Sequence, residues 1–158
     1  MNQNNTGLTM AIGNSPLDCD MALVSVNVQG TLGTLNQQVL NTYEYFSIKQ
    51  ISSIALSKGY ELLQQKGLKP ILFVVTVGQG NTENSLINNL TNAIDNNISI
   101  LEGKRVWVPL MGTGAGGLSF KQSYEITVNI LRKFSSSTDF VLSFPENKEG
   151  VTLYNELR

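Results

Sequence analysis

Four glycines fall within six positions of this chain, in the sequence GTGAGG at residues 112 to 117. Glycines let a backbone adopt positive φ and approach a ligand closely, so several amide hydrogens can point at one anion. Ser119 and Gln122 form a capping-box signature directly after the loop, and the dipole of the helix they start also favours an anion. The loop therefore predicts a diphosphate site. The alternative is a plain strand-to-helix turn, although such a turn needs fewer glycines.

Two well-known phosphate-binding patterns match this loop but fail on their chemistry. A P-loop requires Lys and then Ser or Thr after its last glycine, whereas Leu118 and Ser119 follow Gly117. A dinucleotide-binding loop follows the first strand of a wound sheet and precedes an acidic residue by about 20 positions. Here the loop follows the fourth expected strand, and Glu146 comes too late. Triphosphate hydrolysis and hydride transfer are therefore poorly supported.

The composition narrows the chemistry further. The 158 residues include no histidine and one cysteine, Cys19, which disfavours histidine-activated nucleophiles, an internal disulfide and a metal site. Eleven basic and twelve acidic residues leave no surplus positive charge for nucleic acid. The longest apolar run, residues 71 to 75, is far too short to insert into a membrane, and the start of the chain does not resemble a secretion signal. We therefore expect a cytoplasmic location.

The elements that must position the loop alternate between strands and helices. Strands are expected over residues 8–12 (at an edge), 21–28, 71–77, 105–111 and 139–144. Helices are expected over residues 47–67 (with Ser47 and Gln50 as a capping box), 82–95, 119–134 and 150–157. Such alternation indicates an α/β fold with a mostly parallel sheet covered on both faces. Pro109 suggests that the fourth strand lacks a regular neighbour on one side.

Residues 29 to 46 show weak periodicity and include two glycines, so we expect a long loop there, with a helical turn at most. Tyr43, Tyr45 and Phe46 give this loop apolar surface, and loops of such length are either functional lids or disordered. It would begin beside the ligand crevice, which lies beyond the carboxyl ends of parallel strands. We therefore expect a lid that orders when ligand arrives.

The sequence VPLMGTGAGGLSFKQSYEITVNIL, residues 108 to 131, resembles the second ligand loop of macro domains. In that family, a strand ends in a P-x-x-G-T-G-x-x-G pattern that wraps the diphosphate and distal ribose of ADP-ribose. Residues 12–16 correspond in position to the family's adenine-reading turn. Residues 20–27 correspond to its D-A-I-V-N-A-A-N strand, and residues 140–146 resemble its last strand. The resemblance implies a three-layer α/β/α macro-like domain with a mostly parallel mixed sheet. It would extend over residues 8–158, after a flexible start at residues 1–7.

The resemblance also implies the ligand contacts, with no cofactor, metal or catalytic residue. Asn14 replaces the family's adenine-reading Asp, Phe144 would pack on the adenine face, and Asn27 with Gly33 would hold the distal ribose and its substituent. The diphosphate would be held by Gly112, Thr113, Gly114, Ala115, Gly116 and Gly117. The residues themselves leave open that Asn14 is an ordinary turn residue and that Phe144 belongs to the core. Trp107 is expected in the core.

The departures from the family favour binding over turnover. The glycine triplet that positions water in hydrolytic members is reduced to Gly30 and Gly33, and Ser25 replaces the first Asn of the strand. The resemblance thus implies non-catalytic binding of an ADP-ribose-type nucleotide, or an ADP-ribose conjugate, derived from NAD. The alternative is an ADP-ribosyl hydrolase acting on modified protein or small molecules, with Asn27 and a ligand phosphate positioning water. A third interpretation is an interaction domain with a vestigial loop.

The short GTGAGGLS loop is similar to that of sensor modules in Thoeris-type antiphage systems. In those systems, a TIR-domain enzyme makes an NAD-derived signal, and the macro module switches on an effector. The similarity implies a TIR-domain enzyme as the source of the signal. It also implies fusion of this chain to a membrane-tethered or other effector domain.

Overall fold

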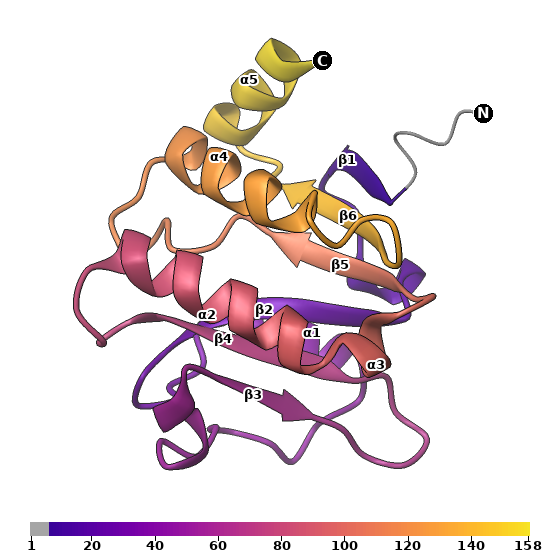
Figure 1. Ribbon diagram of the computed structural model, residues 1–158, viewed down its shortest axis with the longest axis vertical. Coiled ribbons are helices and arrows are strands. Elements are labelled where there is room, and N and C mark those ends of the chain that lie inside the picture. Colours follow the sequence, from indigo (N-terminus) through magenta and orange to yellow (C-terminus); the bar gives the residue numbers. More distant parts are fainter. Residues whose placement is uncertain (1–6) are drawn as a thin grey trace.

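The structure is a computed structural model that describes residues 7–158, so residues 1–6 of the predicted flexible start lie outside the described part. Its six-stranded sheet has the order β1-β6-β5-β2-β4-β3, with β1 at one edge as predicted (Figure 1). The strands are β1 (Leu8–Ile12), β2 (Met21–Asn27), β3 (Tyr60–Leu63), β4 (Ile71–Val77), β5 (Arg105–Pro109) and β6 (Asp139–Phe144). Only β3 runs antiparallel to its neighbour, β4, so the sheet is mixed and mostly parallel.

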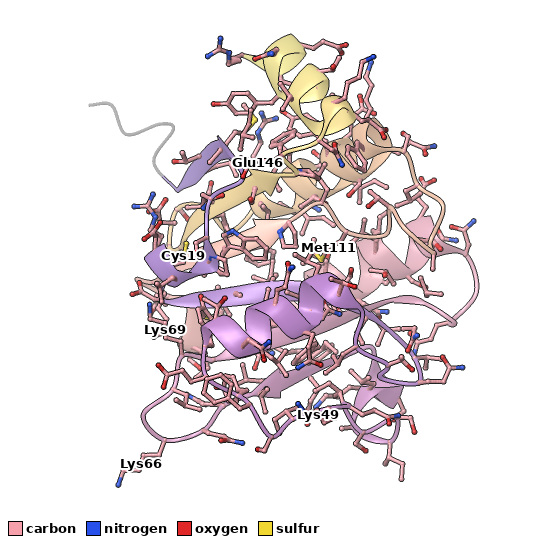
Figure 2. All side chains as sticks on the ribbon, turned by 180° about the vertical axis from the view of Figure 1, so that it is seen from behind. Cys19, Lys49, Lys66, Lys69, Met111 and Glu146 are labelled. Carbon is pink, nitrogen blue, oxygen red and sulfur yellow. The ribbon has the colours of Figure 1, made fainter. Side chains whose placement is uncertain are left out.

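Helices cover both faces of this sheet. They are α1 (Thr34–Thr42), α2 (Thr82–Asn96), α3 (Ile98–Leu101), α4 (Phe120–Leu131) and α5 (Lys148–Leu157), with short 3-10 turns η1 (Pro16–Asp18) and η2 (Ala55–Lys58). Alternate residues of β2 and β4 point to opposite faces. Leu23 and Leu72 join the core under α2 and α4, whereas Ala22 and Phe73 join the core under α1. Figure 2, seen from behind, shows α1 lying across the sheet. The predicted α/β/α fold is therefore confirmed.

The prediction of a long loop over residues 29–46 is wrong, because α1 occupies its centre. The sequence signal was weak, since α1 buries only two apolar side chains, Val39 and Leu40. The aromatic residues after α1 do not form a lid. Tyr43 and Tyr45 are buried, and the Tyr45 hydroxyl donates a 2.7 Å hydrogen bond to the Lys69 carbonyl. These residues close one side of the core.

The prediction of a helix over residues 47–67 is also wrong. Gln50 does not cap a helix, because its side-chain amide donates to the Gln29 carbonyl at 3.1 Å and its backbone forms an isolated bridge with Thr31. The chain then passes through η2 and turns at Gly59, whose φ is 106°, into edge strand β3. Ile54, counted as apolar helix face in the sequence, is 84% exposed.

The other predicted elements are present within a few residues of their expected bounds. The structure also supports the expectation for Pro109. β5 pairs with β6 through Pro109 and Ser143, but its pairing with β2 stops at Trp107 and Ala22. Beyond that point β2 pairs only with β4, and β5 pairs only with β6. The carboxyl edge of the sheet therefore opens between β2 and β5. In the described part of the chain, the helices fall short of the length and apolarity that a membrane span requires.

We predict that the Tyr45→Ala substitution lowers the free energy of unfolding by about 3–5 kcal/mol, because it removes a fully buried ring. The matched control is Phe46→Ala, which should change that free energy by less than about 0.5 kcal/mol, because the Phe46 side chain is 62% exposed. Urea unfolding followed by circular dichroism measures both. Similar small changes in both variants would contradict the anchoring of this segment.

Candidate functional site

Two adjoining cavities lie at the carboxyl edge of the sheet. The larger has a volume of about 640 Å³, the smaller about 370 Å³, and Leu35, Leu110 and Thr113 line both. We call this continuous space the cleft. In sheets of this type, ligands bind in the crevice beyond the strand ends, where neighbouring strands separate. The cleft lies where β5 separates from β2.

The glycine loop borders the smaller cavity, which is lined by Gly112, Thr113, Gly114, Ala115 and Gly116. Two hydrogen bonds close the loop, from the Leu118 amide to the Gly112 carbonyl at 3.0 Å and from the Gly117 amide to the Gly114 carbonyl at 3.1 Å. Among the described residues, the amides of 113–116 donate no backbone hydrogen bond. These four N–H groups are therefore free to bind an anion.

The start of α4 holds the loop in place. Ser119 Oγ accepts from the Gln122 amide at 3.0 Å, and Gln122 Oε1 accepts from the Ser119 amide at 2.8 Å, so the predicted capping box is present. The buried Ser123 hydroxyl donates to the Met111 carbonyl at 2.6 Å, immediately before the loop. The loop is thus fixed at both ends.

The glycines of the loop have different structural roles. Gly112 and Gly117 have φ of 78° and 79°, a conformation that favours glycine. Gly117 does not line either cavity. A Cβ on Gly116 would lie 2.5 Å from the Gly112 carbonyl oxygen, so this glycine is needed for the loop itself. A Cβ on Gly114 would meet no atom within 4 Å and would enter open space.

The smaller cavity brings Asn27 and Gly33 together with the glycine loop, as the macro-domain resemblance implied. Asn27 Oδ1 accepts a hydrogen bond from the Thr31 amide at 3.0 Å. Gly33 is the N-cap of α1, and a Cβ at this position would face open space. The remaining lining side chains are hydroxyls, amides and apolar groups, so none of the described residues that line this cavity carries a charge.

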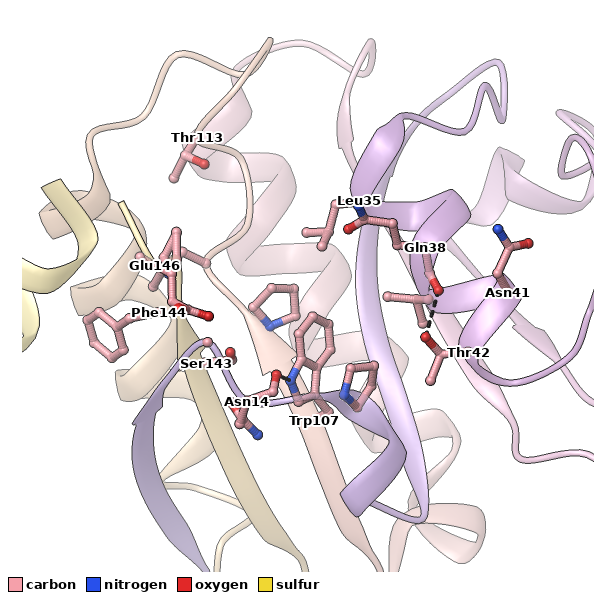
Figure 3. Close-up of a pocket in the computed structure, with 16 residues that line it drawn as sticks. Asn14, Leu35, Gln38, Asn41, Thr42, Trp107, Thr113, Ser143, Phe144 and Glu146 are labelled. Carbon is pink, nitrogen blue, oxygen red and sulfur yellow. Dashed lines mark hydrogen bonds between the residues drawn. The ribbon is translucent and has the colours of Figure 1, made fainter. Parts of the chain in front are cut away.

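The larger cavity contains Asn14 beside Trp107 (Figure 3). The Asn14 carbonyl accepts a 3.1 Å hydrogen bond from the Trp107 indole N–H. The Asn14 side-chain oxygen, by contrast, is buried and has no hydrogen-bond partner among the described residues. A buried acceptor of this kind is costly unless a ligand or water pairs with it. Asn14 therefore leaves an unpaired acceptor beside the larger cavity, and a ligand could reach this oxygen only if the side chain turned.

Phe144 lines the larger cavity, but its side chain is fully buried. The ring packs against Tyr124 and Tyr154, with centroid distances of 6.0 and 5.6 Å, and points away from the cavity in Figure 3. This packing matches the core alternative for Phe144. Trp107 is in the core, as expected, with 4% of its surface exposed, and it also borders the cavity, so it is the better placed aromatic surface.

Sequence analysis placed residues 29–46 beside the ligand crevice, but as a lid that orders on binding, so it missed that a helix, α1, forms a wall of the site. Five residues of α1 line the larger cavity: Leu35, Gln38, Val39, Asn41 and Thr42. Glu146, considered only as part of a dinucleotide motif, lines it as well. The alternation of strands with helices was the available signal, and the weak periodicity of residues 29–46 obscured it.

The groups with displaced pKa values lie outside the cleft. Burial raises the pKa of the Cys19 thiol, and it is also the main cause of the raised pKa values of Tyr43 and Tyr45. Figure 2 shows Cys19 and Lys69 at the same side of the molecule, and the Lys69 ammonium donates to the Cys19 carbonyl at 2.8 Å. Within residues 7–158, no group of three potential metal ligands comes together.

Comparison of sequences finds no matching protein-family model and no matching curated protein. Solved structures do match. The macrodomain of Mycobacterium tuberculosis DarG shares 18% identity and a TM-score of 0.61, over 86% of this chain and 96% of that one. The Oceanobacillus iheyensis macrodomain with ADP shares 15% identity with this chain and superposes with a TM-score of 0.64. The match covers 99% of this chain and 92% of that one. The Trypanosoma brucei macrodomain in complex with ADP-ribose shares 13% identity with this chain and superposes with a TM-score of 0.62. The match covers 94% of this chain and 68% of that one. The chain therefore has the macrodomain fold.

We predict that Gly116→Ala lowers the free energy of unfolding by about 1–3 kcal/mol, since the new methyl group would overlap the Gly112 carbonyl and force the loop to shift. Gly114→Ala should change it by less than about 0.5 kcal/mol, because that methyl group enters the cleft. Chemical unfolding compares the two variants directly. A larger loss for Gly114→Ala would show that the loop does not have this conformation.

Proposed function

We propose that this chain, over residues 8–158, is a domain that binds an ADP-ribose-type nucleotide derived from NAD and does not hydrolyse it. The observation that carries the proposal is the cleft itself, with the free amides of residues 113–116 at one side and Asn14 and Trp107 bordering the adjoining cavity. The Trypanosoma brucei macrodomain of the same fold was solved in complex with ADP-ribose, and the Oceanobacillus iheyensis macrodomain with ADP.

The ligand would span both cavities. The adenine would occupy the larger cavity, where Asn14 offers an acceptor and Trp107 an aromatic surface. The diphosphate would lie at the junction, against the glycine loop, because Thr113 lines both cavities and backbone amides bind phosphate oxygens well. The distal ribose and its substituent would enter the smaller cavity beside Asn27 and Gly33.

Binding without turnover is supported by the lining of the smaller cavity. General acid–base catalysis needs a titratable side chain within hydrogen-bonding reach of the reacting group. The described residues that line this cavity include no Asp, Glu, Lys, Tyr or Cys, and the chain has no histidine. Asn27, the residue that would position water in the hydrolase alternative, already accepts a hydrogen bond from the Thr31 amide.

We further propose that the bound nucleotide is a signal in bacterial antiphage defence. The support is the resemblance of the GTGAGGLS loop to Thoeris sensor modules. A TIR-domain enzyme would supply the signal in the cytoplasm, and an effector domain joined to this chain, membrane-tethered or not, would respond to it.

We predict that isothermal titration calorimetry detects binding of one ADP-ribose per chain. Gly114→Val should weaken binding at least tenfold, roughly the effect of losing one or more charge-assisted hydrogen bonds, because its side chain would fill the space at the loop. The matched control is Ser99→Val, which places the same side chain at an exposed position of α3, outside both cavities. Absence of binding to wild-type protein, with ADP-ribose and ADP alike, would refute the proposed function.

We also predict that this chain releases no ADP-ribose from ADP-ribosylated protein above background. Chromatographic detection of free ADP-ribose over time, with the chain at catalytic amounts, tests this. Release of many equivalents per chain, abolished by Asn27→Ala, would instead establish the hydrolase.

A further inference from the structure

The two edges of the sheet differ in how they are protected. β3, at one edge, has only four residues, and its Glu61 carboxylate pairs with the Lys58 ammonium at 3.3 Å. A short edge strand with charged side chains resists pairing with another strand. β1, at the other edge, has the sequence LTMAI, which contains no charge and no proline, and its register with β6 is regular. Among the described strands β1 pairs with β6 alone, so this edge is open to a further strand.

Every second residue of β1 points its backbone groups away from β6. The Gly7 carbonyl accepts from the Phe140 amide at 2.7 Å, and the Gly13 amide donates to the Phe144 carbonyl at 2.9 Å. Because successive residues of a strand point their backbone groups to opposite sides, residues 7, 9, 11 and 13 face β6. Residues 8, 10 and 12 therefore face outward. The backbone hydrogen bonds between described residues include none from these outward groups to another segment.

The side chains of the same three residues form an apolar strip at the margin of the core. Leu8, Met10 and Ile12 are partly buried, and they belong to the same core cluster as Tyr154 and Leu157 of α5. Figure 1 shows β1 and α5 together at one end of the molecule. A second strand beside β1 would remove more of this apolar surface from water, which is favourable.

We propose that β1 pairs antiparallel with β1 of a second copy of this chain, with Met10 on the two-fold axis. In this register Leu8 faces Ile12 of the other copy, and Thr9 faces Ala11. Large apolar residues then meet on one face of the joined sheet and small residues on the other, as a self-complementary interface requires. The facing pairs of outward residues exchange both of their N–H···O hydrogen bonds. Residues 8–12 line neither cavity, so this interface goes beyond nucleotide binding and does not depend on it.

The two ends of β1 favour a second copy over an unrelated strand. Gly7 and Gly13 bound the strand with φ of 97° and 62°, so regular pairing is confined to the residues between them. The exposed Glu146 lies against Gly13 at the carboxyl end. The turn at residues 132–135, which includes an exposed arginine and an exposed lysine, lies against Gly7 at the amino end. Antiparallel pairing brings the acidic end of one copy to the basic end of the other, and such complementarity selects the partner.

Sedimentation velocity over a concentration series up to about 1 mM tests the dimer, since small interfaces give weak association. Wild-type protein should shift from monomer to dimer along the series. Met10→Pro removes the central outward N–H and leaves the bonds to β6 in place. The matched control, Met10→Ala, loses the same side chain but keeps the N–H. Met10→Pro should raise the dissociation constant of the dimer at least tenfold relative to Met10→Ala, roughly the effect of losing one or two hydrogen bonds.

Disulfide trapping tests the register without relying on the proline variant. Facing Cα atoms of a hydrogen-bonded antiparallel pair are about 5.5 Å apart, within the roughly 4.4–6.8 Å range of a disulfide. Met10→Cys should therefore form a covalent dimer with oxidised glutathione, seen by non-reducing electrophoresis. The matched control is Leu8→Cys, whose counterpart in the other copy would lie about 14 Å away along the strand. Wild-type protein should form no covalent dimer, because its one cysteine, Cys19, is buried.

Three results would each overturn the inference: wild-type protein that stays monomeric throughout the series, equal dissociation constants for Met10→Pro and Met10→Ala, or crosslinking of Leu8→Cys as readily as Met10→Cys. Monomeric wild-type protein would leave this edge to a strand of a different protein. The proposed function would stand in each case, because β1 lies outside the cleft.

Discussion

β2 and β5 pair at only two positions, Met21 with Val106 and Ala22 with Trp107, before they separate. From there β2 continues beside β4 to Asn27, whereas β5 continues beside β6 to Pro109. The cleft exists because of this separation, since strands that stayed paired would leave no space between their carboxyl ends. Proline contributes to it, because a residue without an N–H cannot donate a hydrogen bond to a neighbouring strand.

The separation exposes backbone and side-chain polar groups that the rest of the structure must pair or present to a ligand. On the β5 side, the Trp107 indole donates to the Asn14 carbonyl, and the Ser123 hydroxyl donates to the Met111 carbonyl. On the β2 side, Asn36 of α1 donates to the Ser25 carbonyl at 2.7 Å. These bonds fix both walls of the cleft before any ligand is present. A site fixed in this way loses less conformational entropy on binding than a loop that must order.

Local signals in the sequence were sufficient for most of the fold and misleading over residues 29–67. Ser119 with Gln122 and Ser47 with Gln50 have the same capping-box spacing, and only the first pair caps a helix. The difference is not local. Residues after Ser119 meet the apolar face of the sheet, whereas Gln50 bonds to the chain near Gln29. The glycine loop was predictable because its composition is unusual in itself. The α1 wall was not, because its burial depends on the sheet beneath it.

The proposed anion site of the cleft contains no cation among the described residues. None of the described residues that line it is Lys or Arg, so a diphosphate there would be bound by the neutral amides of residues 113–116. Neutral donors act only at short range and in the right direction, and such a site selects ligands mainly by geometry. The Glu146 carboxylate at the base end disfavours phosphate groups there. With amide donors at one end and a carboxylate at the other, the proposed nucleotide would have one favourable orientation, with its distal ribose in the smaller cavity. That cavity is bordered by uncharged polar groups, so the fit of the ribose substituent, rather than its charge, would decide which nucleotide binds.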